Sequence, residues 1–200
     1  SEKVLVMRVF IIVLVLIFSL QSWTKADDIR DFQIEGMSVE DSLLDFFSED
    51  EINNSRRNYF SNRKYYAVGI SKNIEIYETI DIYLKSGDKS YEIKTIAGYI
   101  FINKKKCLSK RKQVAKELRD LFKNSKEVNS ENDSHAADKT GKSKVYTTSF
   151  LLKNKEADDH IRVECTDWSK DIEDKHNWVD NFNVSAVTKE INSWFLSGYN

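Results

Sequence analysis

The sequence predicts an α+β fold built on an antiparallel sheet of about six strands. Short segments alternate apolar and polar residues, as Tyr66, Val68 and Ile70 do, which is typical of half-buried strands. Two longer segments repeat apolar residues at helical spacing, and each follows a group of three strand-like segments. We therefore expect two three-stranded meanders, each followed by a helix, with the helices covering one face of the sheet.

The first half of the domain, at about residues 38–123, is expected to begin with a helix. Ser38 and Asp41 have the spacing of a capping box, and an apolar stretch follows them. Strands are expected at about residues 64–70, 80–84 and 90–102. Gly98 is expected to mark a bulge in the third strand. The apolar period of residues 104–122 predicts the helix that closes this half.

The second half, at about residues 144–200, has a similar order of elements. Strands are expected at about residues 144–152, 160–168 and 179–187. Thr188 is expected to cap a final helix. The polar residues 124–143 have no apolar period, which predicts a loop or a partly disordered linker between the halves. The similar order suggests an internal repeat, although the halves do not align residue by residue.

Residues 1–26 are expected to be a signal peptide, with residues 1–6 as possible upstream sequence. Arg8 precedes an apolar run at 9–20 that is shorter than a membrane-spanning helix, and small residues follow up to Ala26. Cleavage there would leave a single exported domain at 27–200, periplasmic or secreted, with no membrane insertion. The alternative is an uncleaved signal anchor that carries the same exported domain.

Cys107 and Cys165 are expected to form a structural disulfide. An even pair of cysteines in an exported chain is typical of a bridge rather than of a metal or redox site. Cys107 shares a helical face with Leu118, and Cys165 alternates with Val163 on the apolar side of its strand. Both thiols should thus point toward the core. The alternative is two buried, unpaired thiols.

The charge of the chain does not indicate a nucleic-acid partner. There are 31 Lys and Arg against 32 Asp and Glu, a formal net charge of −1. Cations gather instead between Lys104 and Lys123, with six in residues 104–112. This basic helix face either docks an anionic lipid, glycan or polymer, or is the solvated face of an amphipathic helix. No aromatic residue interleaves the six cations of residues 104–112, which disfavours base stacking.

Two segments have the composition of ligand sites, but their context predicts ordinary surface structure. Residues 136–143 (AADKTGKS) match a relaxed phosphate-loop pattern, yet a polar run precedes them and an alternating strand follows, where that chemistry needs a strand and then a helix. Residues 167–180 gather carboxylates around His176 without the spacing of a calcium loop. The carboxylates are Asp167, Asp171, Glu173, Asp174 and Asp180. The three histidines, which include His135 and His160, lack zinc-site spacing, so we assign no metal or cofactor.

The sequence assigns no catalytic residue. It contains no Gly-x-Ser-x-Gly elbow, and the cysteines are expected to pair with each other. Trp168, Trp178 and Trp194 could line a glycan groove, although aromatic residues at such spacings are more often part of a core. We therefore expect a binding or interaction protein of the cell envelope, whose partner and oligomeric state the sequence leaves open. The alternatives are a small exported hydrolase and an inhibitor or adaptor of another exported protein.

Five segments have a distinctive composition. They are FSLQSWTKADD at 18–28, IEGMSVEDSLLDFFS at 34–48, ADKTGKSK at 137–144, CTDWS at 165–169 and DNFNVSAVTKEINSW at 180–194. Through them, the chain resembles a group of short exported proteins of marine bacteria with AT-rich genomes. The resemblance spans nearly the whole chain and implies export. It carries over no activity and no functional residue.

Overall fold

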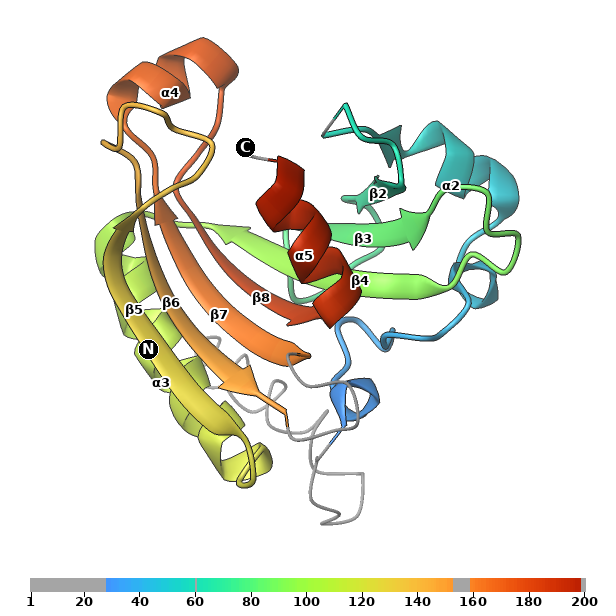
Figure 1. Ribbon diagram of the computed structural model, residues 1–200, viewed down its shortest axis with the longest axis horizontal. Coiled ribbons are helices and arrows are strands. Elements are labelled where there is room, and N and C mark those ends of the chain that lie inside the picture. The colour runs from blue at the N-terminus through green and yellow to red at the C-terminus, as the bar shows by residue number, and fades with distance from the viewer. Residues whose placement is uncertain (1–27, 60, 153–158, 199–200) are drawn as a thin grey trace, which may run out of the picture.

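One antiparallel sheet of eight strands organises the part of the protein that the computed structural model describes, residues 28–59, 61–152 and 159–198 (Figure 1). The strand order is β1-β2-β3-β4-β8-β7-β6-β5. The strands are β1 (Arg56–Arg57), β2 (Tyr65–Ile70), β3 (Thr79–Lys85), β4 (Ile93–Phe101), β5 (Lys126–Ser134), β6 (Lys144–Leu151), β7 (His160–Asp167) and β8 (Asn181–Val187). The leader expected at residues 1–26 lies outside the described residues.

The helical elements are fewer and mostly short. They are η1 (Ile29–Asp31), η2 (Leu43–Asp45), α2 (Glu49–Asn54), α3 (Lys104–Leu121), α4 (Lys170–His176) and α5 (Lys189–Gly198). The mixed α+β class is therefore confirmed. The arrangement of six strands in two meanders is wrong, because the described part of the chain has eight strands and β4 pairs with β8 to make the sheet continuous. In the described part of the chain, no helix combines the length and the apolar character needed to cross a membrane.

The expectation of a loop throughout residues 124–143 is wrong, because β5 occupies much of that segment. β5 is an edge strand that pairs only with β6. One side of it faces α3 through ion pairs: Arg119 Nε lies 2.7 Å from Glu127 Oε2, and Arg111 pairs with Glu131. Charged side chains thus take the positions where a core strand would carry apolar ones. This is why periodicity did not reveal the strand.

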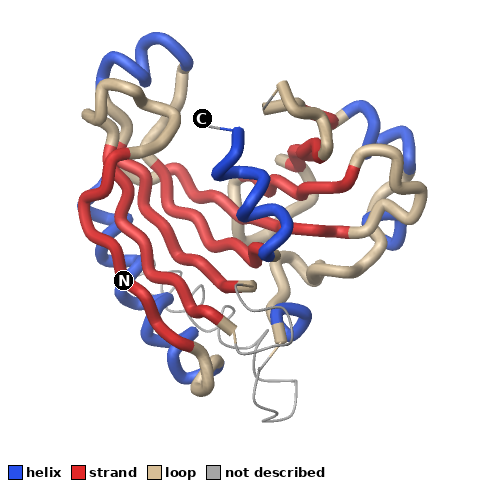
Figure 2. The backbone as a smooth tube through the Cα atoms, viewed as in Figure 1, coloured by secondary structure: helices blue, strands red, loops and turns tan. Residues whose placement is uncertain are grey.

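The two long helices cover opposite faces of the sheet, so the expectation that helices cover one face is also wrong. α3 packs on β6, β7 and β8, while α5 lies on the other side, against the strands of the first half (Figure 2). Trp194 of α5 contacts Tyr65 edge-on, with ring centroids 5.3 Å apart. The next residue, Tyr66, belongs to the core on the α3 side. This is the alternation expected of a strand that is covered on both faces.

The predicted disulfide is confirmed and fastens α3 to the sheet. Cys107 on α3 and Cys165 on β7 are bonded, with their Cα atoms 5.8 Å apart. Both residues are almost fully buried within the larger core, among residues of β6, β7 and β8. Helical and strand periodicity each placed its cysteine on the correct face.

The prediction that a helix begins at Ser38 is wrong. Ser38 N donates to Asp41 Oδ2 at 2.7 Å, but this contact closes a turn. The helix begins at Glu49, after a complete capping box between Ser48 and Glu51. The contact between Ser38 and Asp41 forms, but it does not begin a helix.

Gly98 does not mark a bulge. It pairs in register with Ile80, and the irregularity of this pair of strands falls between Tyr83 and Leu84 instead. The ring of Tyr77 lies directly over Gly98, where a Cβ atom would come within 2.5 Å of Tyr77 Cδ1. Glycine is thus required here by a close approach and not by backbone conformation.

Candidate binding face

The side of the sheet that faces away from α3 is polar along β7 and β8. Along β8, every second residue points toward α3 and is apolar, and the residues between them are polar. Each of those polar residues is paired with a polar residue of β7. This set, called the polar face below, consists of Arg162, Glu164, Thr166, Asn181, Asn183 and Ser185.

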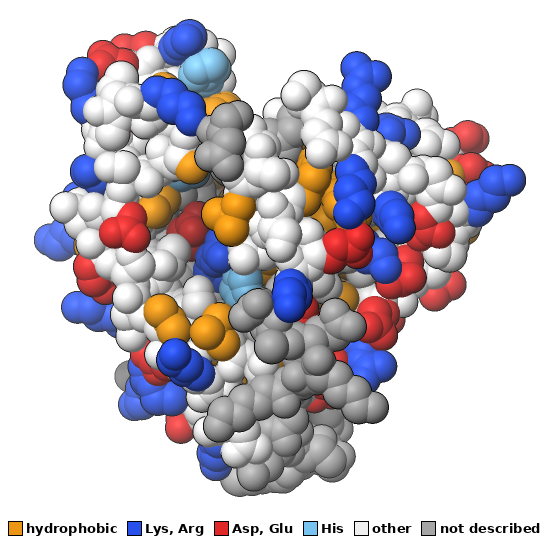
Figure 3. All heavy atoms as spheres, in the orientation of Figure 1, with side chains coloured by type: hydrophobic (Ala, Val, Ile, Leu, Met, Phe, Trp, Pro, Cys, Tyr) orange, Lys and Arg blue, Asp and Glu red, His pale blue; other side chains and the backbone are white. Residues whose placement is uncertain are grey.

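The polar face forms the floor of a hollow. The sheet curves so that β5 and β6 rise on one side and α5 stands on the other, with α4 at one end (Figure 1). The space-filling view shows this side of the molecule hollowed, with acidic and basic side chains deep between α5 and the strands opposite (Figure 3). The fold therefore concentrates polar groups on a concave surface, as ligand sites commonly do.

Arg162 connects this floor to α5. Its Nη2 atom lies 2.9 Å from His160 Nε2 and 3.4 Å from Asn192 Oδ1 on the helix. One guanidinium thus reaches both the strand and the helix that border the hollow. The remaining N–H groups of Arg162 are further hydrogen-bond donors on the half-buried floor.

Glu164 supplies acceptors beside Arg162. Its Oε1 atom accepts from Asn183 Nδ2 at 3.4 Å and from Thr166 Oγ1 at 3.5 Å. Both distances are at the long end of the range for hydrogen bonds, and a carboxylate has about four lone-pair sites. Glu164 therefore retains capacity to accept hydrogen bonds from a ligand.

The polar residues of β8 are unusually buried for their chemistry. Asn183 and Ser185 are each 6% exposed and Asn181 is 9% exposed. The Nδ2 atom of Asn181 donates to Val179 O at 3.0 Å, but its Oδ1 atom has no hydrogen-bond partner among the described residues. Burying polar groups with incomplete pairing costs free energy, so packing alone would favour apolar residues at these positions.

Four aromatic and imidazole rings close one end of the polar face. Trp168 follows β7, and its ring centroid lies 4.2 Å from that of His135 and 4.6 Å from that of Trp178. His176, at the end of α4, stacks on Trp178 with centroids 4.8 Å apart. Burial lowers the pKa of His135. We call these four residues the aromatic cluster; Trp178 is its most exposed tryptophan, at 39%.

A shallow cleft of about 250 Å³ lies beside the aromatic cluster. It is lined by Phe101, Ile102, Asn103, Glu173, Val179 and Asp180. Phe101 is 47% exposed and pairs directly with Asn181 of the polar face. Aromatic rings therefore lie on both sides of Asn181: Phe101 is exposed, and Trp168, which follows Thr166 on the other neighbouring strand, is half-buried.

Asp81 on β3 adds a buried carboxylate toward the other edge of the sheet. It accepts from Tyr59 Oη at 3.0 Å and lies 3.6 Å from Arg57 Nη1. Burial raises the pKa of Asp81. Glu164 on β7 and Asp81 are separated by three strand spacings, or about 14 Å across the sheet. That exceeds the separation of about 5–9.5 Å between the two carboxyl groups of glycosidases.

The segment that resembles a phosphate loop is the turn between β5 and β6. Asp138 accepts hydrogen bonds from the backbone N–H and hydroxyl groups of both Thr140 and Ser143. These bonds, first those from Ser143, hold the pKa of Asp138 well below its usual range. A strand, not a helix, follows the turn. The backbone N–H groups of the turn donate to the carboxylate of Asp138 and not to a ligand. The geometry is therefore that of a structural turn.

The carboxylates around His176 diverge instead of forming a metal site. Each of four contacts a different group: Asp167 pairs with Lys104, Asp171 with Lys142, Asp174 with Lys170, and Asp180 with the backbone N–H of Trp168. The expected charged loop also contains a short helix, α4. The structure describes no group of three or more His, Cys, Asp or Glu residues arranged to hold a metal ion within 28–59, 61–152 and 159–198.

Only part of this face could be predicted from the sequence. Of the three tryptophans predicted as possible groove residues, Trp194 belongs to the core, whereas Trp168 and Trp178 belong to the aromatic cluster. Arg162, Glu164 and Asn183 were not predicted, although their alternation with apolar residues is visible in the sequence. Alternation indicates a polar side to a strand, but it does not reveal that this side is concave and buried.

No protein-family model, curated protein or solved structure matches the chain. The candidate face is therefore interpreted from its own geometry.

Proposed function

We propose that this protein is an exported binding protein that holds a glycan of the cell envelope on the polar face. The observation that carries the proposal is the set of buried and half-buried polar side chains on β7 and β8, bordered by the exposed rings of Phe101 and Trp178. Sugar hydroxyl groups both donate and accept hydrogen bonds, and the C–H faces of sugar rings are apolar. Such a ligand matches a surface that combines amide, carboxylate and guanidinium groups with aromatic faces.

The position of the polar face within the sheet favours a ligand recognised through side chains. β7 and β8 are inner strands, so their backbone N–H and C=O groups are used in ladders with both neighbours. An extended peptide that adds a strand needs a free sheet edge, which this surface does not have. A glycan needs no backbone partner.

The disulfide supports a location outside the cytoplasm. Such bonds persist in oxidising compartments and are rare in cytosolic proteins. The leader expected at residues 1–26 supports the same location. We accordingly propose that the mature protein is periplasmic or secreted.

The hydrolase alternative has less support. On the polar face, Glu164 lies three strands away from Asp81, which is too far for a pair of catalytic carboxyl groups. Ser143 is fully buried, and its hydroxyl group donates to Asp138, which leaves it unsuited to act as a nucleophile. An adaptor role remains a separate outcome of the test below.

Binding to purified, insoluble peptidoglycan tests the proposal. We expect the protein to sediment with this polymer, and Glu164→Gln and Trp178→Ala each to weaken binding by about tenfold, the equivalent of about 1.4 kcal/mol. Phe46→Ala is the matched control for Trp178→Ala, because Phe46 is a similarly exposed ring, at 42%, far along the chain from this face. Equal sedimentation of all four proteins would reject the polar face as the site. Release of soluble fragments would favour the hydrolase, and a co-purifying protein without glycan binding would favour the adaptor.

A further inference from the structure

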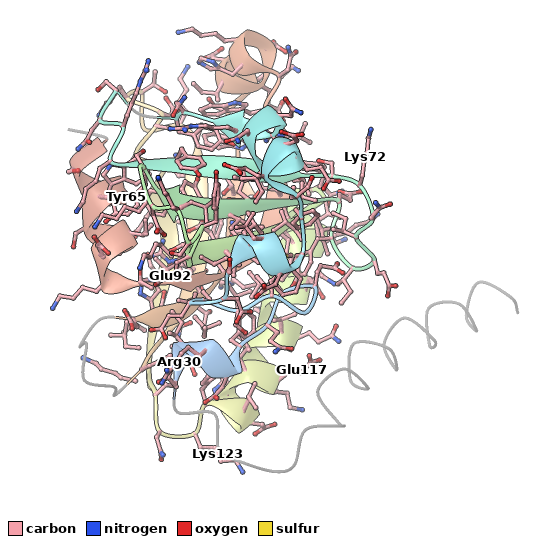
Figure 4. All side chains as sticks on the ribbon, turned by 90° about the vertical axis from the view of Figure 1, so that its right-hand side faces the viewer. Arg30, Tyr65, Lys72, Glu92, Glu117 and Lys123 are labelled. Carbon is pink, nitrogen blue, oxygen red and sulfur yellow. A yellow bond between two sulfur atoms is a disulfide. The ribbon has the colours of Figure 1, made fainter. Side chains whose placement is uncertain are left out.

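The outer side of α3 carries a row of lysines. Cys107 and Leu118 define the side of the helix that faces the core. At about 100° per residue, Lys105, Lys112 and Lys116 project within about 20° of a single line on the opposite side. Lys123 follows the C-terminal end of the helix (Figure 4). We call these four residues the lysine row.

Three other cations of α3 pair with carboxylates of the sheet and so differ from the lysine row. Arg111 is buried and pairs with Glu131, and Arg119 makes two hydrogen bonds to Glu127. Lys104 pairs with Asp167 of β7. The four lysines of the row are exposed instead.

No ion pair within 4 Å joins the lysine row to a carboxylate among the described residues. The carboxylates of Glu117 and Asp120 lie on one flank of the row, and the exposed Lys106 lies on the same flank. The outer surface of α3 therefore keeps an excess of positive charge.

An acidic segment lies at the opposite end of the molecule. Residues 40–51 contain six carboxylates and no Lys or Arg. They precede and form α2, which lies on the side of the sheet farthest from α3 in Figure 1. This separation of charge would orient the protein on a negatively charged surface, with the lysine row toward the surface and residues 40–51 away from it.

We propose that the lysine row docks the protein on the surface of an anionic lipid bilayer. Lys105, Lys112 and Lys116 lie along one line of an exposed helix and can contact a plane at once, and Lys123 adds a charge beyond the end of the helix. Residues 104–121 of α3 include no aromatic residue on which bases could stack. The contact is adsorption to the headgroups, because no apolar side chain accompanies the lysines on the outer side of α3.

The expected strength of docking follows from the number of lysines. Each Lys near an anionic membrane surface contributes about 1 kcal/mol, so removing four of them should weaken partitioning by about two to three orders of magnitude. The attraction acts within about one Debye length, roughly 10 Å at 0.1 M salt, so raising the salt concentration should release the protein.

Sedimentation with vesicles tests the proposal. A chain that begins at Asp27 keeps every described strand and helix and excludes the apolar residues 7–26. It is mixed with vesicles of phosphatidylcholine alone or with about 30% phosphatidylglycerol, an anionic lipid. The test variant is K105Q/K112Q/K116Q/K123Q. The control, with the same change in charge at exposed lysines elsewhere on the molecule, is K72Q/K85Q/K89Q/K175Q.

We expect the parent and control proteins to bind only the anionic vesicles, and the test variant to lose at least about 100-fold in partitioning. Circular dichroism should be the same for all three proteins. Equal binding by the two variants, or equal binding to neutral vesicles, would overturn the proposal. So would a parent protein that binds soluble dextran sulfate through the row yet ignores anionic vesicles, since the partner would then be a polymer. The lysine row and the polar face lie on opposite sides of the sheet, so we expect the test variant to keep its binding to peptidoglycan, and the two proposals fail separately.

Discussion

Reduction of the disulfide should remove a large part of the stability of this fold. The bond joins Cys107 to Cys165 and closes a loop with a sequence separation of 58. In the chain-entropy model a loop of this length restricts the unfolded state by about 4 kcal/mol. Because a domain is typically stable by only about 5–15 kcal/mol, this is a substantial fraction.

The assay compares urea unfolding of the same protein in its oxidised and reduced forms. We expect the midpoint to fall by about 1–4 M, given a slope of about 1–3 kcal/mol per molar urea. This comparison leaves every side chain in place, whereas a Cys→Ala change would also remove packing at two fully buried positions.

The control is the C107A/C165A variant, which should be insensitive to reductant. An unchanged midpoint on reduction of the parent protein would refute the chain-entropy reasoning. Two titratable free thiols in protein purified without reductant would refute the bond itself.

Three further results are expected. Gly98→Ala should destabilise the protein by about 1–3 kcal/mol through overlap with Tyr77, and the cost should shrink in a Tyr77→Ala background, as a double-mutant cycle would measure. The pKa of Asp138 is lowered in the folded state, so its stabilising contribution is present above about pH 4 and is lost as the pH falls below that; Asp138→Asn should flatten this acid limb in thermal melts. Glu127→Gln breaks an exposed pair with Arg119 and should cost less than about 1 kcal/mol overall, while hydrogen exchange quickens locally in β5.

The strands with an apolar side could be predicted from the sequence. β2, β3, β6, β7 and β8 all lie close to their expected positions, because burying one face imposes alternation on the residues themselves. The same reasoning placed α3 and the two cysteines. Each of these predictions depends on a local pattern that a buried face requires.

The elements that were missed are stabilised by contacts distant in sequence. β5 depends on ion pairs with α3 and on its ladder with β6, so its own residues lack an apolar period. The opposite placement of α3 and α5 could not be read from either helix, because an amphipathic helix shows which of its sides is buried and not which side of the sheet buries it.

The same limit applies to the candidate face. Polar residues at alternate positions of β7 and β8 were visible, but alternation alone describes an ordinary solvated side. The curvature of the sheet, the contact of α5 with Arg162 and the position of Trp178 at one end of the polar face are visible only in the tertiary structure.

The sequence by itself thus determined the fold class, the disulfide and most strands, because periodicity is a local record of which side chains are buried. The tertiary structure decided the strand order, the side on which each helix packs, and which polar residues share a concave surface. Those properties arise from pairing between segments far apart in the chain, and no single segment encodes its partner.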